Sequence, residues 1–409
     1  MEICYQRCAG LDVHKATVVA CVLVSGGRRL REQETKTFAT HTRGLLELAD
    51  WLAGWGVTHV AMEATGVYWK PVWAILEGRF ELLLANARQM RNLPGRKTDV
   101  SDAAWIADLL RHGLLKASFV PPRPIQDLRD LVRYRAQVVR ERAAVANRIG
   151  KVLEQANIKL GDVASDIMGR SGQEMIEALV EGEEDPGRLA GHARRQLRRK
   201  REELELALEG RVREHHRYLL GRLLEHWRFL GRQIQELEAE LERQMAPFAE
   251  AVARLETIPG VSRVTAWTIV AEIGVEMKQF GSAARLASWA GVCPGQRESG
   301  GKRRSGRIRP GNVWLRSVLC EAAWGARRKK DCYFGAFYQR LAARRGKRRA
   351  LVAVAHALLV VVYYVLERGE NYQELGGDYF DRLNAEGIKR HYLRRLRQLG
   401  VKVTVEAPA

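Results

Sequence analysis

The sequence predicts an α/β domain with a mixed sheet, followed by a mainly α-helical remainder of long coiled-coil arms and a helical C-terminal domain. β-rich apolar runs alternate with helical periodicity near the N-terminus, apolar residues recur every seven positions in two later stretches, and glycine-rich breaks interrupt the helical pattern after residue 255. We therefore predict three domains, 1–118, 119–254 and 255–409, with 161–200 as an insertion or arm tip.

The N-terminal domain is predicted to hold strands first and then alternating helices and strands. Residues 10–24 form one long strand, or two short ones with a break near His14. The later elements are a strand near 36–38, a helix over 45–55, a strand over 58–63, a helix around 72–76 and a strand over 80–85. This order is typical of a mixed α/β sheet.

Heptad spacing marks two stretches after Pro122. The first contains Leu131, Val138, Val145 and Val152, and the second contains two interleaved series, Leu223, Leu230 and Leu237 with Trp227, Ile234 and Leu241. Such spacing predicts two long helices that pair antiparallel as coiled-coil arms, with an ordinary helical bundle as the alternative. The apolar helix over 349–366 is predicted to form the core of the C-terminal domain.

The charge of the chain indicates a nucleic-acid partner. Its formal net charge is +20, and residues 291–350 alone hold seventeen Lys and Arg against three acids. The six cysteines form no C-x-x-C pair, so we expect neither structural zinc nor a disulfide framework. No secretory signal is predicted, and the apolar run 350–365 is short for a membrane span, so we expect no membrane partner and a cytoplasmic, nucleoid-associated protein.

Four acids are placed to form a divalent metal site. Asp12 lies in the first strand, Glu63 ends a later strand, and Asp99 and Asp102 lie at the start of a helix. Converging carboxylates repel one another, and bound Mg²⁺ (or Mn²⁺) relieves that repulsion and supports phosphoryl transfer. Taken singly, each acid could instead be a turn, strand-end or helix-capping residue.

Two glycine-containing segments of the C-terminal domain are candidates for contact with phosphate. The first, 258–262, is predicted to form a helix–hairpin–helix in which Gly260 and Ser262 approach the nucleic-acid backbone; a tight turn with Gly260 at positive φ is the alternative. The second places Ser299 beside two glycines and a set of cations: Lys302, Arg303, Arg304, Arg307 and Arg309. Residue chemistry alone favours a flexible, basic DNA-contacting loop there over a nucleophile.

Together these motifs resemble the IS110 family of insertion-sequence transposases. The N-terminal matches are Gly10-Leu-Asp-Val-His-Lys15, Glu63-Ala-Thr-Gly66 and Lys97-Thr-Asp-Val-Ser-Asp-Ala103. The C-terminal matches are Ile258-Pro-Gly-Val261, the segment 286–294, Ser299-Gly-Gly-Lys302 and Gly311-Asn-x-x-Leu-Arg316. The resemblance implies a RuvC-like (RNase H-type) domain whose metal ligands are Asp12, Glu63, Asp99 and Asp102. It also implies that Ser299 is a nucleophile that forms a covalent phosphoserine.

The resemblance further implies partners that composition does not reveal. Members of the family assemble into oligomers and use a structured noncoding RNA from the element's ends to pair with donor and target DNA. We therefore predict an RNA-guided recombinase that cuts and rejoins DNA to move an insertion sequence, working as a dimer or tetramer. The alternatives are a Holliday-junction-type nuclease that uses the carboxylates and a water, and a non-catalytic nucleic-acid-binding scaffold.

Overall fold

The structure is a computed structural model that describes residues 2–26, 30–64, 66–86, 90, 102–295 and 297–403, with the backbone alone at 26, 30–31, 297–299 and 302–305. The chain forms two compact units, Met1–Val120 and Pro121–Ala409, and each is described by itself.

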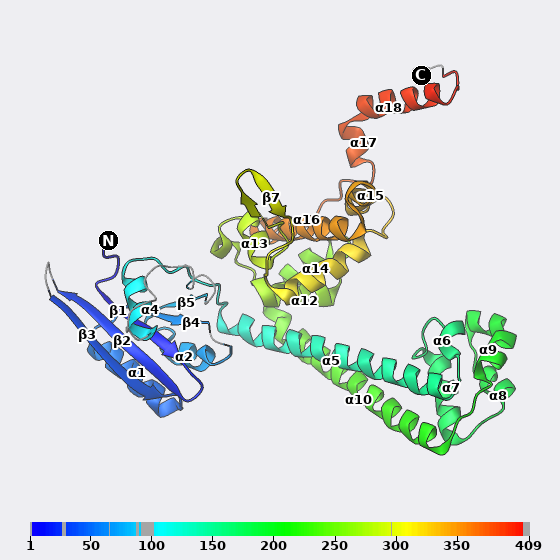
Figure 1. Cartoon of the computed structure of the whole chain (residues 1–409), viewed down its shortest axis with the longest axis horizontal. Helices are drawn as coiled ribbons and strands as arrows, with labels where there is room; N and C mark the ends of the chain where they lie inside the picture. Colours follow the sequence, from blue (N-terminus) through cyan, green and yellow to red (C-terminus); the bar gives the residue numbers. More distant parts are fainter. Residues whose placement is uncertain are drawn as a thin grey trace. The chain divides into compact units, whose positions relative to one another are not determined.

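The first unit is built on a five-stranded mixed sheet in the order β3-β2-β1-β4-β5. Its strands are β1 (Arg7–Val13), β2 (Thr17–Gly26), β3 (Leu30–Ala39), β4 (His59–Glu63) and β5 (Glu81–Ala85) (Figure 1). The first three strands are antiparallel neighbours, whereas β4 runs parallel to both β1 and β5. The predicted mixed sheet is confirmed, and the break near His14 is the turn between β1 and β2.

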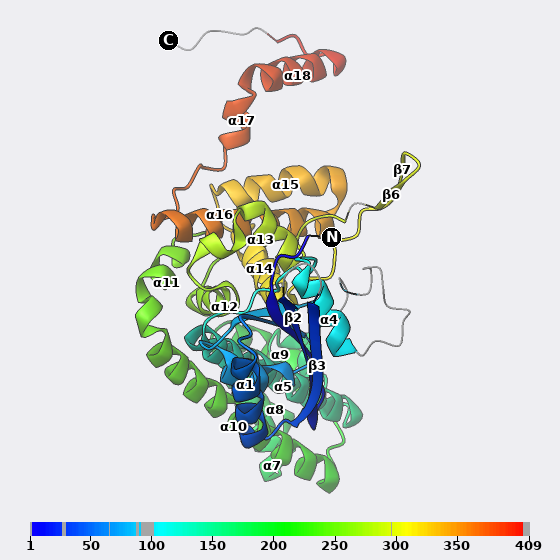
Figure 2. The ribbon, with the colours of Figure 1, turned by 90° about the vertical axis from the view of Figure 1, so that its left-hand side faces the viewer.

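Helices cover both faces of this sheet. On one face, α1 (Thr42–Gly54) and α2 (Trp69–Leu76) bury leucines such as Leu48 and Leu52 against the strands. On the other face lies α4 (Asp102–Arg111) (Figure 2), which packs against buried strand residues such as Ala61. A Cβ on Gly10 would collide with the backbone of Ala103 and Ala107, so glycine at this position lets α4 approach β1 closely.

The second unit begins with two long helices, α5 (Arg123–Gln155) and α10 (Glu214–Met245), which run antiparallel side by side (Figure 1). Heptad residues of both helices, Val138 and Val145 on one and Leu230 and Ile234 on the other, are buried in one cluster. At their polar edge, Arg142 lies 3.8 Å over the ring of Trp227. The heptad pattern therefore marks the residues through which these helices meet.

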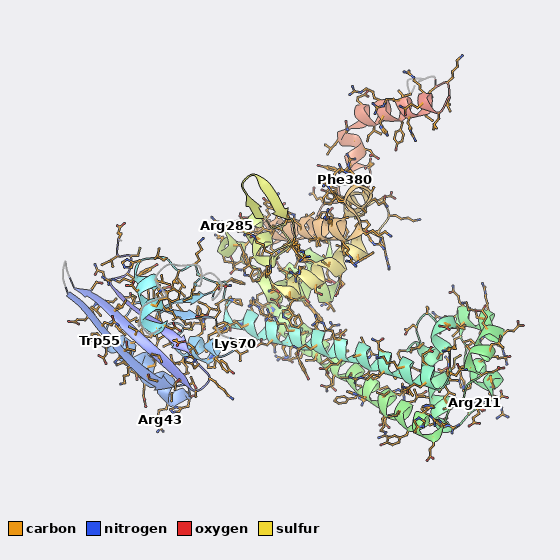
Figure 3. All side chains as sticks on the ribbon, viewed as in Figure 1. Arg43, Trp55, Lys70, Arg211, Arg285 and Phe380 are labelled. Atoms are coloured by element: carbon orange, nitrogen blue, oxygen red, sulfur yellow. The ribbon has the colours of Figure 1, made fainter. Side chains whose placement is uncertain are left out.

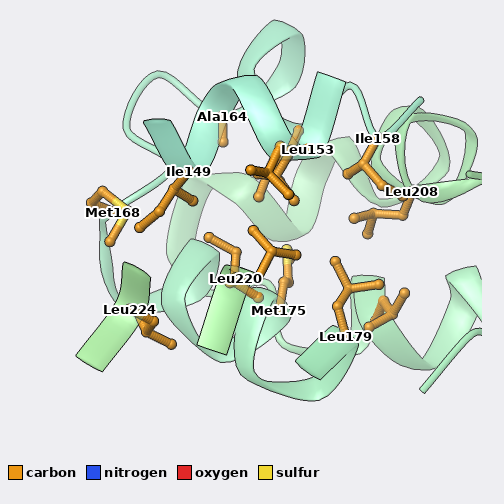
Figure 4. Packing of buried hydrophobic residues seen from close by; sticks show 14 of the residues in the cluster. Ile149, Leu153, Ile158, Ala164, Met168, Met175, Leu179, Leu208, Leu220 and Leu224 are labelled. Carbon is orange, nitrogen blue, oxygen red and sulfur yellow. The ribbon is translucent and has the colours of Figure 1, made fainter. Parts of the chain in front are cut away.

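A small helical tip joins the distal ends of α5 and α10. Its elements are α6 (Leu160–Val163), α7 (Arg170–Glu181), α8 (Pro186–Gly191), the 3-10 helix η1 (Arg195–Lys200) and α9 (Arg201–Leu208). Figure 4 shows Met175 and Leu179 of α7 packed with Ile149 and Leu153 of α5 and Leu220 of α10. The segment 161–200 is thus part of a folded unit with its own apolar core.

The remaining helices form the C-terminal part of the second unit. They are η2 (Ala246–Phe248), α11 (Ala249–Glu256), α12 (Arg263–Ile273), η3 (Met277–Phe280), α13 (Ala283–Ala290), α14 (Val313–Ala326), α15 (Tyr333–Arg345) and α16 (Lys347–Arg368). Among the described residues, α16 is the one helix long and apolar enough to cross a membrane. It packs against α11, α13, α14 and α15 and buries Val354, Leu358 and Val362, as the predicted core helix should.

Two further helices, α17 (Tyr379–Leu383) and α18 (Ala385–Gln398), end the described chain. Aromatic rings connect α17 to α15: Phe380, labelled in Figure 3, stacks on Tyr333 and Phe337 with ring centres 5.2 and 5.8 Å apart. Glu374 accepts hydrogen bonds from the backbone N–H groups of Tyr333 and Gly376 and so holds the connecting segment in place.

Candidate active site

Asp12 and Glu63 lie next to each other at the carboxyl ends of two parallel strands. The β1–β4 register pairs Gly10 with Ala61 and Leu11 with Met62, so Asp12 and Glu63 are the next residues in the same register. Side chains alternate along a strand, which places both carboxylates on the face shared with Gly10 and Ala61, the face that α4 covers. Their backbones are separated by about one strand spacing, roughly 4.8 Å.

Asp102 approaches the same end of the sheet from α4. This helix runs antiparallel to β1, because its Ala103 lies over Gly10 whereas its last residue, Arg111, accepts a hydrogen bond from Cys4 before the strand begins. The first turn of α4, where Asp102 lies, is therefore at the end of β1 that carries Asp12. A carboxylate in this turn is also stabilised by the helix dipole. Three of the four predicted acids thus belong to elements that end toward the same corner of the sheet.

The side chain of Asp12 already has a polar partner. Its Oδ2 lies 3.0 Å from Nε2 of His14, with 61% of the His14 side chain and 20% of the Asp12 side chain exposed. Within the part of the chain that the structure describes, no group of three or more His, Cys, Asp or Glu side chains is close enough to hold a metal ion. The fourth predicted ligand, Asp99, lies outside the described residues.

Ser299 ends the first strand of a two-stranded hairpin in the second unit. The hairpin consists of β6 (Arg297–Ser299) and β7 (Lys302–Ser305), with Ser299 paired to Lys302. Gly300 and Gly301 connect the strands with φ angles of 57° and 71°, the left-handed conformation that a tight two-residue hairpin turn requires. Residue chemistry favours a loop here, and the backbone of this segment pairs as a hairpin, because two glycines adopt this turn at no steric cost.

The hairpin extends from a fixed base (Figure 2). There, Gly295 N–H donates to Arg307 O at 2.8 Å, and Pro294 forms an isolated bridge with Ile308. Arg307 and Arg309 lie exposed on the chain that returns from β7. The other predicted cations, Lys302, Arg303 and Arg304, belong to β7 itself.

Gly260 and Ser262 have structural roles in the turn between α11 and α12. Gly260 has a φ of 87°, and a Cβ there would collide with the backbone of Ala322 on α14. Ser262 caps α12, because its Oγ accepts from the backbone N–H of Thr265 at 3.3 Å. The tight-turn alternative accounts for both residues, and phosphate contact at this turn stays a prediction.

Comparison with known proteins identifies the family to which these motifs belong. Residues 9–158 match a family model named for the DEDD transposases of IS110 and described as "Transposase". Residues 252–339 match the "Transposase IS116/IS110/IS902 family", and the two matches together cover more than half of the chain. The chain belongs to the IS110 family of transposases.

Individual relatives agree with this family. The transposase is 28% identical over 287 residues to the "Transposase for insertion sequence element IS1111A" of Coxiella burnetii, covering 68% of each chain. It is 26% identical over 325 residues to the "Probable family 20 transposase" of Pseudomonas aeruginosa, covering 77% of this chain and 85% of that one. A transposase acts on DNA, in agreement with the strongly basic composition.

The transposase also contains a buried carboxylate that the sequence motifs do not single out. Glu272 of α12 has no solvent exposure, and Arg133 of α5 binds both of its oxygens at 2.7 and 2.8 Å. Asn312, which caps α14, donates to Glu272 Oε2 at 2.6 Å, and Arg129 of α5 donates to the backbone oxygens of Ala271 and Glu272.

This network joins the base of the arm to two helices of the C-terminal part. Burial lowers the pKa of Arg129, and the nearby Glu272 carboxylate opposes that shift. The sequence signal that could have revealed the network is Glu272, the one charged residue in the mostly apolar run 266–273. A charge at such a position requires a partner.

Proposed function

We propose that this transposase cuts and rejoins DNA through a covalent bond to Ser299, with Asp12, Glu63, Asp99 and Asp102 holding the divalent ion that strand cleavage requires. The observation that carries the proposal is the position of Ser299 beside the Gly300-Gly301 turn. A Cβ at either glycine would meet no atom within 4 Å, so the turn leaves room for a DNA backbone. The proposed functional divisions are 1–118, 119–254 and 255–409.

The chemistry assigned to Ser299 is transfer of a phosphoryl group. Its Oγ loses its proton and forms a bond to the scissile phosphorus while the bond from phosphorus to one sugar oxygen breaks. The sugar oxygen takes up a proton, which leaves a phosphoserine and a free hydroxyl end. A hydroxyl end of another strand then attacks the phosphoserine, which releases Oγ and completes the exchange. The cations 302–304, with Arg307 and Arg309, offset phosphate charge along the hairpin.

The carboxylate corner fits a hard divalent cation in its donor chemistry. Asp12, Glu63 and Asp102 offer oxygen ligands from two strands and a helix, the ligand type that Mg²⁺ and Mn²⁺ prefer. When bound, such an ion would supply charge stabilisation to phosphoryl transfer. His14 would orient the Asp12 carboxylate through their contact. The mixed sheet that positions these acids supports a RuvC-like domain.

The nucleophile is tested by trapping the covalent intermediate. We expect Ser299→Ala to abolish the protein–DNA adduct seen after denaturing electrophoresis of a reaction on element-end DNA. The matched control is Ser305→Ala, in the same hairpin, which should retain the adduct. An adduct that persists in Ser299→Ala contradicts the assignment, and cleavage that yields only free ends with Ser299 intact indicates the junction-nuclease alternative.

The carboxylates are tested by charge-neutral replacement. We expect Asp12→Asn and Glu63→Gln each to lower the cleavage rate by at least about 100-fold, as expected when a ligand or electrostatic group of a catalytic site is lost. The control is Glu81→Gln. Glu81 begins β5, at the end of the strand away from Glu63, and we expect this variant to cleave at the unchanged rate. Full activity in both test variants would leave the carboxylates without a catalytic role.

We further propose that the transposase works as a dimer or tetramer with a structured noncoding RNA. The support is the family membership and the basic charge, which suits two nucleic-acid partners. Sequencing of RNA that copurifies with the chain from cells carrying the whole element is the test. The proposal requires enrichment of a transcript from the element's ends, and random cellular RNA would contradict it.

A further inference from the structure

The arm tip contains a groove that the catalytic proposal does not use. Two segments alone line it, 163–174 and 191–200, and its volume is about 1240 Å³. The groove lies within residues 159–251, which fall between the two stretches matched by the family. We call it the tip groove.

Positive charge is concentrated along one wall of the tip groove. Residues 192–201 include six Lys and Arg and no acid. The lining has five cations and two carboxylates; the cations are Arg170, Arg194, Arg195, Arg198 and Lys200. Charge is thus segregated on the tip, because the segment 181–185 outside the groove contains four acids. The groove is suited to a polyanion.

The two carboxylates of the lining are already engaged within the tip. Glu174 accepts from Arg194 through both oxygens, at 2.6 and 3.0 Å, and from Arg170 at 3.3 Å. Asp166 accepts from the backbone N–H of Met168 at 2.9 Å. Arg194 also donates its backbone N–H to Ser171 Oγ, so this arginine holds the two walls together. Three exposed cations of the lining remain: Arg195, Arg198 and Lys200. Arg198 donates its Nε to the backbone oxygen of Ala193 at 3.1 Å, and Lys200 lies 3.7 Å from Glu203, which is not a lining residue.

The size and residue types of the groove define the ligand. Pockets for small ligands measure roughly 300–1,000 Å³, so this groove suits a segment of a polymer better than a single nucleotide. No Phe, Tyr or Trp is among its lining residues, so it offers no ring on which an unpaired base could stack. A Cβ at Gly191 would meet no atom within 4 Å, so this exposed part of the lining leaves room for a backbone to approach.

We propose that the tip groove binds the phosphodiester backbone of a double helix, as a second nucleic-acid contact separate from the Ser299 hairpin. The tip lies at the opposite end of α5 and α10 from α12, to which Arg129 and Arg133 connect the arm. The transposase therefore holds nucleic acid at two points along one chain, and the tip contact is independent of base sequence because phosphates carry no sequence information.

The test measures binding of the full chain to a short labelled duplex by fluorescence anisotropy as salt is raised. The variant combines Arg195→Asn, Arg198→Gln and Lys200→Gln; asparagine is chosen at 195 because Arg195 has a φ of 51° and Asn tolerates this conformation. We expect affinity to fall on the order of tenfold, and the slope of log affinity against log salt to fall by roughly 2–3, about one for each phosphate that the variant no longer neutralises. The assay is run with a DNA duplex and with an RNA duplex, and the duplex whose affinity the variant lowers identifies the kind of backbone that the groove binds.

A control variant removes the same charge elsewhere. Arg222→Gln, Arg243→Gln and Arg254→Gln change three surface arginines that pair with glutamates on their own helices, outside the groove. The proposal requires that this control keep the parent salt slope. If both triple variants change the slope equally, the effect is one of net charge and the groove has no specific role.

A second measurement avoids dependence on the fold of a triple variant. Gln196, an exposed and uncharged residue of the lining, is replaced by cysteine carrying a photo-crosslinker, with Gln137→Cys on the exposed side of α5 as its control. We expect crosslinks to duplex from Gln196→Cys above the level of Gln137→Cys and of the parent chain. Crosslinks from Gln196→Cys to a second protein chain instead, or crosslinks no stronger than the control, overturn the proposal.

Discussion

The carboxylate of Glu272 has no solvent access, so the free-energy cost of burying its charge must be offset by the groups around it. Arg133 supplies two hydrogen bonds, Asn312 supplies a third, and the charge of Arg129 lies 3.5 Å from Oε2. A buried ion pair adds little net stability when complete, but removing one partner leaves an uncompensated charge. Single substitutions in this network should therefore destabilise the junction between the arm and the C-terminal helices more than substitutions elsewhere in the junction.

We expect Arg133→Ala to lower the free energy of unfolding of the second unit by about 3–5 kcal/mol, the usual cost of breaking a buried pair. Arg135→Ala is the matched control two residues away, because its partner Glu238 is 36% exposed. Its cost should be about 0–1 kcal/mol. Urea unfolding followed by circular dichroism compares the two, and equal losses would show that burial of Glu272 is not the cause.

Among the elements, those with a strong apolar period were predictable from sequence. The strand over 58–63 and the helix over 45–55 coincide closely with β4 and α1. The centre of β4 is a continuous buried apolar run, and burial repeats with helical spacing along α1. The heptad positions identified the contact between α5 and α10 for the same reason. For the candidate site, the sequence predicted Asp12 and Glu63 as ligands of one metal site. The parallel register of β1 and β4, which no local pattern revealed, brings the backbones of these two residues together.

Other elements lacked such a signal. The β6–β7 hairpin has polar residues on both strands, so only Gly300-Gly301 indicated a turn. The tip consists of short helices that bury few residues each, and its core forms only when Met175, Leu189 and Leu204 meet residues of the arm. The Glu272 network depends on partners 139 and 40 residues away in sequence, which no local pattern reveals.

The N-terminus of α10 provides a pH-dependent element. The burial of His216 and the positive charges of His215 and Arg213 lower the pKa of His216 below its ordinary 6.5. Its Nδ1 accepts the backbone N–H of Arg213 at 3.3 Å, a contact made by the neutral ring. The unfolded chain binds a proton near pH 6.5 that the folded chain does not bind, so stability is complete above this pH and falls as the pH is lowered through it.

We therefore expect the melting temperature of the second unit to drop more steeply below about pH 6.5 in the parent chain than in His216→Gln. The control is His226→Gln, an exposed residue of the same helix, which should leave the pH dependence unchanged. Identical pH profiles for the parent chain and His216→Gln would exclude this residue as the source.

At the scale of the whole molecule, the two units have separate cores. Strands and helices of the first unit bury two apolar clusters without any residue beyond Val120. A fragment of about 120 residues with its own core is within the size range of independent domains. We expect residues 1–120, expressed alone, to unfold in one cooperative thermal transition by circular dichroism. A thermal scan without a cooperative transition would show that this unit requires the rest of the chain in order to fold.

The anchored arm has a mechanical consequence. At about 1.5 Å per residue, the part of α5 from Arg133 to its end at Gln155 is roughly 33 Å long. A rotation of about 6° where Arg133 binds Glu272 would therefore move the far end of α5 by roughly 3.5 Å. A rotation of a few degrees at this buried ion pair would thus displace the distant tip by several ångströms.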